Sequence, residues 1–288
     1  MRIISELRVV KIWNAGVLDD LLANTHTKAR RIPLSGWQLL REGFPDQPEV
    51  GPSLSRVLLD QVSRGERPAT VRLSRPGRVV AFGRRDVVSP GYPEAVAAAG
   101  RKGFPGMERL AGGRAAAFSE GALSLTFTLP DPQPAKRTGL RFAELTSLVR
   151  EALSMLGVDA RIGPVPDEYC PGEFSLNARG VTKLAGVGQR MIQGAAHVGF
   201  VIVVSGAGLI ADTLEPVYAS LGIDYSRESV GCIQDEVPSA DRHQVEEALL
   251  DRISRNAPLE PVTLDPVTLE TARSKASRFR SEPDPGLV

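Results

Sequence analysis

The sequence predicts a fold that mixes α-helices with β-strands, and three segments carry this prediction. Residues 121–130, GALSLTFTLP, alternate apolar and polar side chains with the period of a β-strand. Residues 142–157 repeat apolar side chains at helical spacing and end at a glycine. Residues 183–204 combine small, polar and β-branched residues and predict two further strands, joined near Gln193 and Gly194. At 288 residues, the chain is long enough for one large domain of this class.

Shorter signals predict the elements that precede these segments. Residues 53–65 place leucines and valines at helical spacing between a serine N-cap and a terminating glycine, which predicts a helix. Residues 69–74 and 78–83 are rich in β-formers, and the Pro-Gly pair between them predicts a hairpin. The alanine-rich segment that follows ends at Gly100 and predicts a compact surface helix.

Beyond residue 235 the composition shifts toward charged residues. Residues 245–255 predict an amphipathic helix, and residues 268–281 predict a second, more polar one. The final segment, SEPDPGLV, contains two prolines and a glycine and is expected to be disordered. We therefore divide the chain into a main domain at 1–235 and a small helical tail at 236–288.

The composition is that of an ordinary globular protein and excludes several classes of function. Hydrophobic residues make up 42% of the chain and charged residues 24%, so neither disorder nor a fibrous protein is indicated. The 35 Lys and Arg against 34 Asp and Glu leave a net charge of +1, which gives no overall attraction to nucleic acid or to an anionic membrane. Charges interrupt the first 16 residues, unlike a secretion signal, and the longest apolar run, 198–204, is too short to cross a bilayer. We expect a cytoplasmic protein with neither nucleic acid nor membrane as a partner.

Several familiar catalytic and metal-binding motifs are absent from the sequence. It has no GxxxxGK[ST] and no strand-to-helix GxGxxG for phosphates, no HExxH or CxxC for zinc or redox chemistry, and no GxSxG for a serine hydrolase. We therefore predict no metal site. The two cysteines, Cys170 and Cys232, indicate thiol chemistry or simple burial before a disulfide framework.

Cys170 is the first candidate for catalysis. It lies in DEYCPGEFSL, where the following Pro-Gly pair predicts a turn that holds the thiol at the mouth of a loop; the alternative is a small buried hydrophobe. Carboxylates in the same run would raise the pKa of the thiol, so a reactive Cys170 needs a cation nearby.

Lys183 is the best candidate for this cation, because Gly186 and Gly188 let the backbone approach a ligand closely. The alternative is a solvated surface lysine.

A second group of candidates lies in the run RLAGGRAAAF. Arg109, the pair Gly112-Gly113 and the alanines after them leave space along one wall for an extended apolar ligand such as a fatty-acyl chain. The alternative is a glycine bulge followed by small core residues. His197 is one of three histidines, and either serves as a base or hydrogen-bond partner or is a satisfied core histidine.

Two of these runs resemble segments of a known superfamily, and they occur in the chain in the same order as in that superfamily, with the RLAGG run before the YCPG run. YCPGEFSLNARGVTKLAGVGQR resembles the catalytic segment of the biotin/lipoate protein ligases and octanoyltransferases, and RLAGGRAAAFSEGALSLTF is similar to their RxxGG strand pair. RVVAFGRRD resembles the strand and loop just before that pair, so the similarity covers residues 67–206. The YCPG run is most similar to the amidotransferase branch, which moves octanoyl groups from the glycine-cleavage H protein to the lipoyl domains of 2-oxoacid dehydrogenases.

The resemblance implies a fold and a mechanism. It implies an α/β fold of the α+β type, with a mixed, mainly antiparallel sheet flanked by helices in a ligase-like catalytic domain, followed by the short helical tail. It implies that Cys170 carries the acyl group as a thioester and that Lys183 binds the acyl carbonyl, with no cofactor required. Two alternatives stay open: a ligase for lipoate or biotin that uses ATP and Mg, and a non-catalytic protein that binds a lipoyl domain or an acyl chain.

The expected site residues fall into three groups. The catalytic pair is Cys170 and Lys183. The expected substrate-binding residues are Arg109, Gly112, Gly113, Gly186, Gln189 and His197. The acceptor should be a small acidic carrier domain, so the arginines Arg84, Arg85 and Arg190 are candidates for docking it, although exposed arginines often dock nothing.

Overall fold

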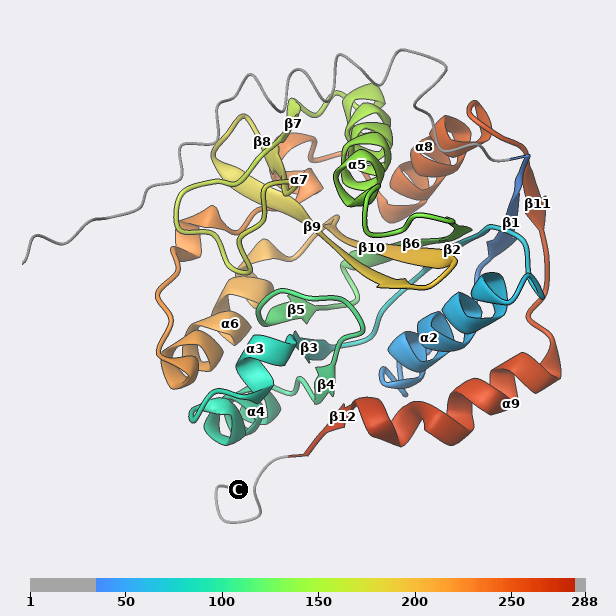
Figure 1. Cartoon of the computed structure of the whole chain (residues 1–288). Helices are drawn as coiled ribbons and strands as arrows, with labels where there is room; N and C mark the ends of the chain where they lie inside the picture. The colour runs from blue at the N-terminus through green and yellow to red at the C-terminus, as the bar shows by residue number, and fades with distance from the viewer. Residues whose placement is uncertain (1–34, 283–288) are drawn as a thin grey trace, which may run out of the picture.

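The computed structural model describes residues 35–282, and this part of the chain is built around two β-sheets (Figure 1). The larger sheet has the strand order β11-β1-β2-β6-β10-β9-β8-β7. Its strands are β1 (Trp37–Leu40), β2 (Thr70–Ser74), β6 (Ala122–Pro130), β7 (Ala160–Ile162), β8 (Leu176–Ala178), β9 (Thr182–Ile192), β10 (Ala195–Val203) and β11 (Leu259–Pro261). β1 is parallel to β2 and β11, and the other neighbouring pairs are antiparallel. The predicted mixed, mainly antiparallel sheet is confirmed.

The smaller sheet takes in the strand that we expected to form a hairpin with β2. It has the order β12-β4-β3-β5, with β3 (Val79–Phe82), β4 (Gly106–Glu108), β5 (Ala116–Phe118) and β12 (Arg280–Ser281). β2 pairs with β6 and β3 pairs with β4 and β5, so the predicted hairpin is wrong. The turn between them packs against another loop, where a Cβ on Gly77 would lie 2.0 Å from the carbonyl oxygen of Pro45. The Pro-Gly turn therefore carries the chain from one sheet to the other.

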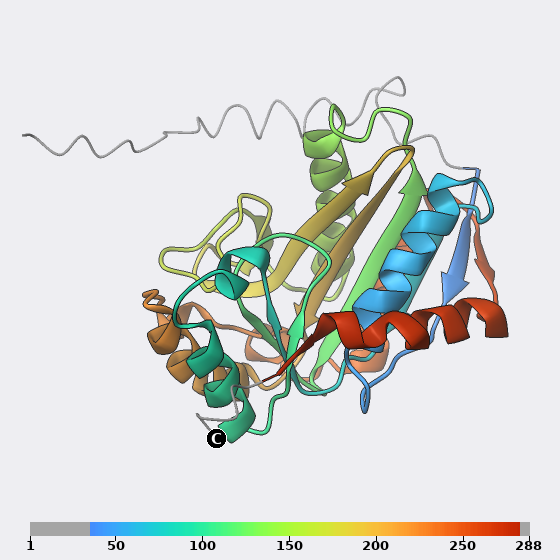
Figure 2. The same ribbon diagram turned by 60° about the horizontal axis from the view of Figure 1, so that its bottom comes forward.

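Helices cover both faces of the larger sheet (Figure 2). α5 (Thr138–Met155) and α8 (Arg242–Ser254) pack on the face that receives the apolar side chains of β6. α2 (Val50–Ser63) lies over the other face, and α9 (Pro266–Lys275) packs against α2. The helices predicted at 53–65 and 142–157 and the strand pair at 183–204 are confirmed, and both helices start earlier than predicted.

The smaller sheet has its own apolar core. It packs against α4 (Tyr92–Arg101) and α6 (Ala207–Leu221). α4 is the predicted alanine-rich helix, but residues 95–99 are buried, so it is a core helix and not a surface one. The remaining short helices of residues 35–282 are α3 (Arg84–Val87), η3 (Arg227–Ser229), α7 (Ile233–Glu236) and η4 (Ala276–Phe279).

Residues 236–282, which we expected to form a separate helical tail, join both sheets. β11 pairs with β1, β12 pairs with β4, and α8 places Val245 and Leu249 in the same core as α5 and β6. The expectation of an appendage is wrong, because the charged residues seen in the sequence belong to helices whose apolar faces are buried. The expectation of a disordered C-terminus at 281–288 is wrong for Ser281, which belongs to β12, and its part at 283–288 lies outside the described residues. The expectation of a non-secretory N-terminus concerns the first 16 residues, which also lie outside them. No helix within the described part is both long and apolar enough to cross a membrane.

Candidate active site

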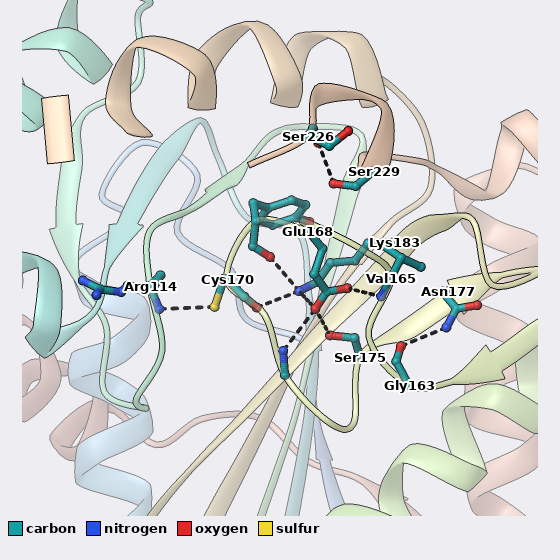
Figure 3. A network of polar contacts seen from close by, with 12 residues as sticks. Arg114, Gly163, Val165, Glu168, Cys170, Ser175, Asn177, Lys183, Ser226 and Ser229 are labelled. Carbon is teal, nitrogen blue, oxygen red and sulfur yellow. Dashed lines mark hydrogen bonds and ion pairs between the residues drawn. The ribbon is translucent and has the colours of Figure 1, made fainter. Parts of the chain in front are cut away.

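Cys170 lies on the loop between β7 and β8, and its backbone is held from two sides. Figure 3 shows the contact with Lys183 on one of them. Its φ of 43° is in the left-handed region, which a non-glycine residue adopts at a cost and where active-site residues are often found. Its N–H donates to Tyr218 Oη at 2.7 Å, and its carbonyl oxygen accepts a hydrogen bond from Lys183 Nζ at 2.8 Å. Tyr218 itself donates to the carbonyl of Ala115 at 2.9 Å. The hydroxyl therefore ties the Cys170 loop to the glycine-rich segment opposite.

The sulfur atom of Cys170 receives two hydrogen bonds. Arg109 Nη2 donates to Sγ at 3.1 Å, and the backbone N–H of Arg114 donates at 3.3 Å. Burial would raise the pKa of the Cys170 thiol, but the charges of Arg109 and Lys183 and these two hydrogen bonds outweigh burial, so the pKa lies below its ordinary value. The cation that we expected near the thiol is thus mainly Arg109, with Lys183 as the second. A thiolate in this position is a nucleophile.

Gly113 makes the contact between Arg109 and Cys170 possible. Its φ of 121° is one that other residues rarely adopt. A Cβ there would lie 1.7 Å from Arg109 Nη2 and 2.9 Å from Cys170 Sγ. We expected the Gly112-Gly113 pair to leave space for an apolar ligand, but the missing side chain of Gly113 leaves room for the Arg109 guanidinium beside the sulfur.

Lys183 is fully buried, so the alternative of a solvated surface lysine is wrong. Its Nζ donates to Glu168 Oε1 at 3.0 Å and to the carbonyl oxygens of Tyr169 at 2.9 Å and Cys170 at 2.8 Å. It also lies 4.8 Å from the centre of the Tyr169 ring. All three ammonium hydrogens are thus directed at the loop that carries the thiol. In this structure Lys183 positions Cys170.

Glu168 joins the two halves of the Cys170 loop. Its Oε1 accepts hydrogen bonds from Ser175 Oγ at 2.6 Å and from the N–H of Gly172 at 3.1 Å, in addition to Lys183. Its Oε2 accepts from the N–H of Val165 at 3.1 Å. We had expected carboxylates in this run to raise the pKa of the Cys170 thiol. The Glu168 carboxylate instead pairs with Lys183. A buried carboxylate with this many donors is fixed in place.

A cavity of about 210 Å³ opens beside the thiol on the α2 face of the larger sheet. Cys170, Arg109, Gly113 and Lys183 line one part of it. Its apolar walls include Val79, Met107, Ala116, Ala117, Val187 and Val201. The predicted wall of small residues after the glycine pair is present. The cavity can hold an extended acyl group with its carbonyl near the sulfur.

Residues 47–254 match the family model described as the lipoyl protein ligase A/B catalytic domain. This match covers well over half of the chain. The chain belongs to this family. The resemblance seen in the sequence is confirmed.

Several curated relatives and solved structures are similar to this chain. An octanoyl-[GcvH]:protein N-octanoyltransferase of Bacillus velezensis is 26% identical over 202 residues, which are 67% of this chain and 70% of that protein. A lipoyl-[GcvH]:protein N-lipoyltransferase of Listeria monocytogenes is 28% identical over 45% of this chain and 46% of its own length. The first curated relatives are matched over 61–70% of their length. The lipoate protein ligase of Thermoplasma acidophilum has the same fold, with a TM-score of 0.66, 18% identity and coverage of 85% of this chain and 93% of that one.

The other predicted substrate residues of this family member divide between the two faces of the sheet. Gly186 and His197 line the cavity. Burial and the charge of Arg72 lower the pKa of His197 to about 3, so the ring is neutral, and its Nδ1 is 2.9 Å from Thr128 Oγ1. Gln189 lies on the opposite face of β9, where its Oε1 accepts hydrogen bonds from the buried Arg141 at 2.9 and 3.2 Å. The structure therefore places Gln189 away from the site.

The three candidate docking arginines lie on exposed positions. Arg84 and Arg85 belong to α3, next to the smaller sheet, and Arg190 belongs to β9. Sequence reasoning missed Tyr218, Glu168 as a loop partner and the N–H of Arg114. Tyr218 comes from a helix far along the chain, and only the fold brings it to Cys170.

Proposed function

We propose that this protein transfers an octanoyl or lipoyl group from one carrier protein to a lysine of another through a thioester on Cys170. The observation that carries the proposal is the Cys170 sulfur, which receives hydrogen bonds from Arg109 and from the N–H of Arg114 beside an acyl-sized cavity. The names of the curated relatives support the same activity, an acyltransferase acting on the glycine-cleavage H protein, GcvH. The lipoyl domains of 2-oxoacid dehydrogenases are the proposed acceptors.

The chemistry has two steps with Cys170 as the carrier. The thiolate attacks the carbonyl carbon of the acyl-lysine amide on the donor, the C–N bond breaks, and the donor lysine leaves as an amine after taking up a proton. The amine of the acceptor lysine then attacks the thioester, loses a proton and releases the Cys170 thiolate. The developing oxyanion is proposed to accept a hydrogen bond from Lys183 or from backbone N–H groups near Gly113. This route consumes no ATP.

The proposal includes the setting of the reaction. Donor and acceptor are small acidic carrier domains, and Arg84, Arg85 and Arg190 are the proposed contacts for them. The cytoplasm, where the protein would meet the lipoyl domains of 2-oxoacid dehydrogenases, is the proposed location.

Intact-protein mass spectrometry after incubation with octanoylated H protein tests the proposal. The wild type and Cys232→Ala should gain one octanoyl group that hydroxylamine removes, without ATP, and Cys170→Ala should gain none. Cys232 is the matched control, because it is the other cysteine and is buried away from the cavity. Modification of a lipoyl domain only when free acid, ATP and Mg are added would show a ligase instead. Binding without transfer under either condition would show a non-catalytic protein.

A further inference from the structure

A buried arginine that the proposed reaction does not use lies in the same cavity. Arg72, on β2, is 5% exposed and lines the cavity together with Cys170. Its Nη2 donates to the carbonyl of Gly51 at 3.2 Å and to Ser55 Oγ at 3.1 Å. Its Nε is buried and has no hydrogen-bond partner among residues 35–282, and within that part of the chain no carboxylate forms an ion pair with it. Burial lowers the pKa of Arg72 to about 10, which leaves the side chain charged.

The strand register places Arg72 at the opposite end of the cavity from the thiol. Arg72 is paired with Thr126, Thr126 with Gly199, and Gly199 with Gly188, so the four form one row across β2, β6, β10 and β9. Three strand spacings, roughly 14 Å, separate the two ends of this row. The glycine end lies beneath the glycine-rich loop, where a Cβ on Gly188 would lie 3.0 Å from Ala111 Cβ. An acyl chain that starts at Cys170 and crosses the two glycines points at Arg72.

The Arg72 end of the cavity is built for a polar group. Ser55, Ser124, Thr126 and the neutral His197 line it beside Arg72. The described residues that line the whole cavity include four cations, Arg72, Arg75, Arg109 and Lys183, and neither Asp nor Glu. The charge of Glu42 acts on Arg72, but no ion pair joins the two, and the buried Nε–H has no acceptor among the described residues. An unused N–H of a buried guanidinium is unfavourable in a pocket filled by hydrocarbon. A ligand that brings an acceptor to this position satisfies that N–H.

We propose that Arg72 binds a hydrogen-bond acceptor at the far end of the acyl group, so that the cavity takes a chain ending in oxygen or sulfur in preference to plain octanoyl. A carboxylate oxygen would both accept from Nε and offset the charge, and a lipoyl sulfur is a weaker acceptor. This inference rests on the proposed function of the cavity as the acyl site. It adds what the far end of the acyl group must carry.

Binding of three Nε-acyl-lysine amides to the Cys170→Ala protein, measured by calorimetry, tests this inference without requiring transfer. The acyl groups are octanoyl, lipoyl and 7-carboxyheptanoyl, which share a chain of eight carbons and differ at the tip. We expect at least one acceptor-tipped ligand to bind about tenfold more tightly than the octanoyl ligand. Arg72→Met, in the same background, should remove this preference and retain octanoyl binding. Equal affinities, no binding of any ligand, or a preference that survives Arg72→Met would overturn the inference.

Two further variants keep the test interpretable. Arg56→Met is the matched control, because Arg56 is the cation next to Ser55 on α2 and pairs with Asp60 at the surface. It should leave the preference unchanged. If Arg72→Met does not fold, Ser55→Ala replaces it, since it removes one acceptor that orients the guanidinium, and an unchanged preference there also contradicts the inference. If no acyl transfer is observed but the Cys170→Ala protein still prefers acceptor-tipped ligands, the proposed function is wrong and the inference about Arg72 stands.

Discussion

At the scale of single residues, the site is organised around one contact, that between the Arg109 guanidinium and the Cys170 sulfur. The positive charge favours the thiolate, and Gly113 provides the space for it. Cys232 has the opposite environment, because burial raises the pKa of its thiol. The chain thus contains one cysteine with a lowered thiol pKa and one with a raised thiol pKa, and the second can be compared with the first in experiments.

The pH dependence of Cys170 alkylation follows from this contact. In a Cys232→Ser background, labelling by iodoacetamide should reach half its maximal rate below about pH 8.5, the ordinary thiol pKa. Arg109→Gln removes the cation that lowers the pKa, so the midpoint should move to higher pH and labelling at pH 7 should become several-fold slower. Arg78→Gln, which breaks an exposed pair with Glu120, is the control and should leave the midpoint in place. A midpoint that Arg109→Gln does not raise would contradict this account of the site.

Much of the site could be predicted from single residues, because short motifs identify them. Cys170, Lys183 and the glycine pair belong to local runs whose turn and spacing are visible in the sequence. Gln189 could have been placed correctly as well, since Gly186 and Gly188 share one face of a strand and Gln189 lies on the other. Tyr218 and Arg72 could not, because their contacts depend on which distant elements pack together.

At the scale of elements, the Cys170 loop is held by a buried ion pair instead of by regular structure. Lys183 from β9 and Glu168 from the loop are both fully buried and 3.0 Å apart. Removal of either partner leaves the other charge buried without its opposite charge, which costs about 3–5 kcal/mol. The pair therefore fixes the loop only while both members are present.

Single and double substitutions test this role of the pair. Glu168→Gln and Lys183→Met should each lower the free energy of unfolding by about 3 kcal/mol, and the double variant should lose less than the sum. Asp159→Asn, which breaks an exposed pair with Arg161 on β7, should change it by less than about 1 kcal/mol. Urea unfolding measures all four. Losses that are no larger than that of Asp159→Asn, or that simply add, would show that the pair does not hold the loop.

Element types were more predictable than element partners. The period-two pattern of β6 and the helical stripe of α5 are strong local signals, and both elements formed where they were expected. The predicted Pro-Gly turn after β2 is present. Turn residues indicate that the chain changes direction, but they do not indicate which sheet the next strand joins. β3 pairs with β4 and β5, which come later in the chain, so the sequence of the turn does not identify its sheet.

At the scale of the whole molecule, the last described segment, α9 to β12, packs against α2 and extends the smaller sheet. Leu264, Ala272 and Ala276 are buried against α2, and β12 adds a strand beside β4. α2 in turn covers the cavity beside Cys170 through Ser55 and Pro52. The C-terminal segment thus supports the cavity from outside without lining it.

Truncation tests this support. A chain that ends at Val262 loses α9 and β12, and burial of Leu264 alone is worth about 1.5–3 kcal/mol. Its Tm should fall by at least about 5 °C. A chain that ends at Glu282 keeps every contact described and is the control. Equal Tm values for the two truncated chains would mean that the C-terminal segment is dispensable for stability.

The ammonium group of Lys183 has no free N–H, and this affects the order of events in the proposed reaction. Each of its three N–H groups already has an acceptor in the Cys170 loop. An acyl carbonyl that binds Lys183 must displace one of these acceptors, so substrate and loop compete for a single donor. By thermodynamic linkage, each weakens the other's hold on Lys183 by the same factor. Under the proposed mechanism, loading of the acyl group would therefore loosen the loop around the Cys170 thioester at the stage when the acceptor lysine has to reach it.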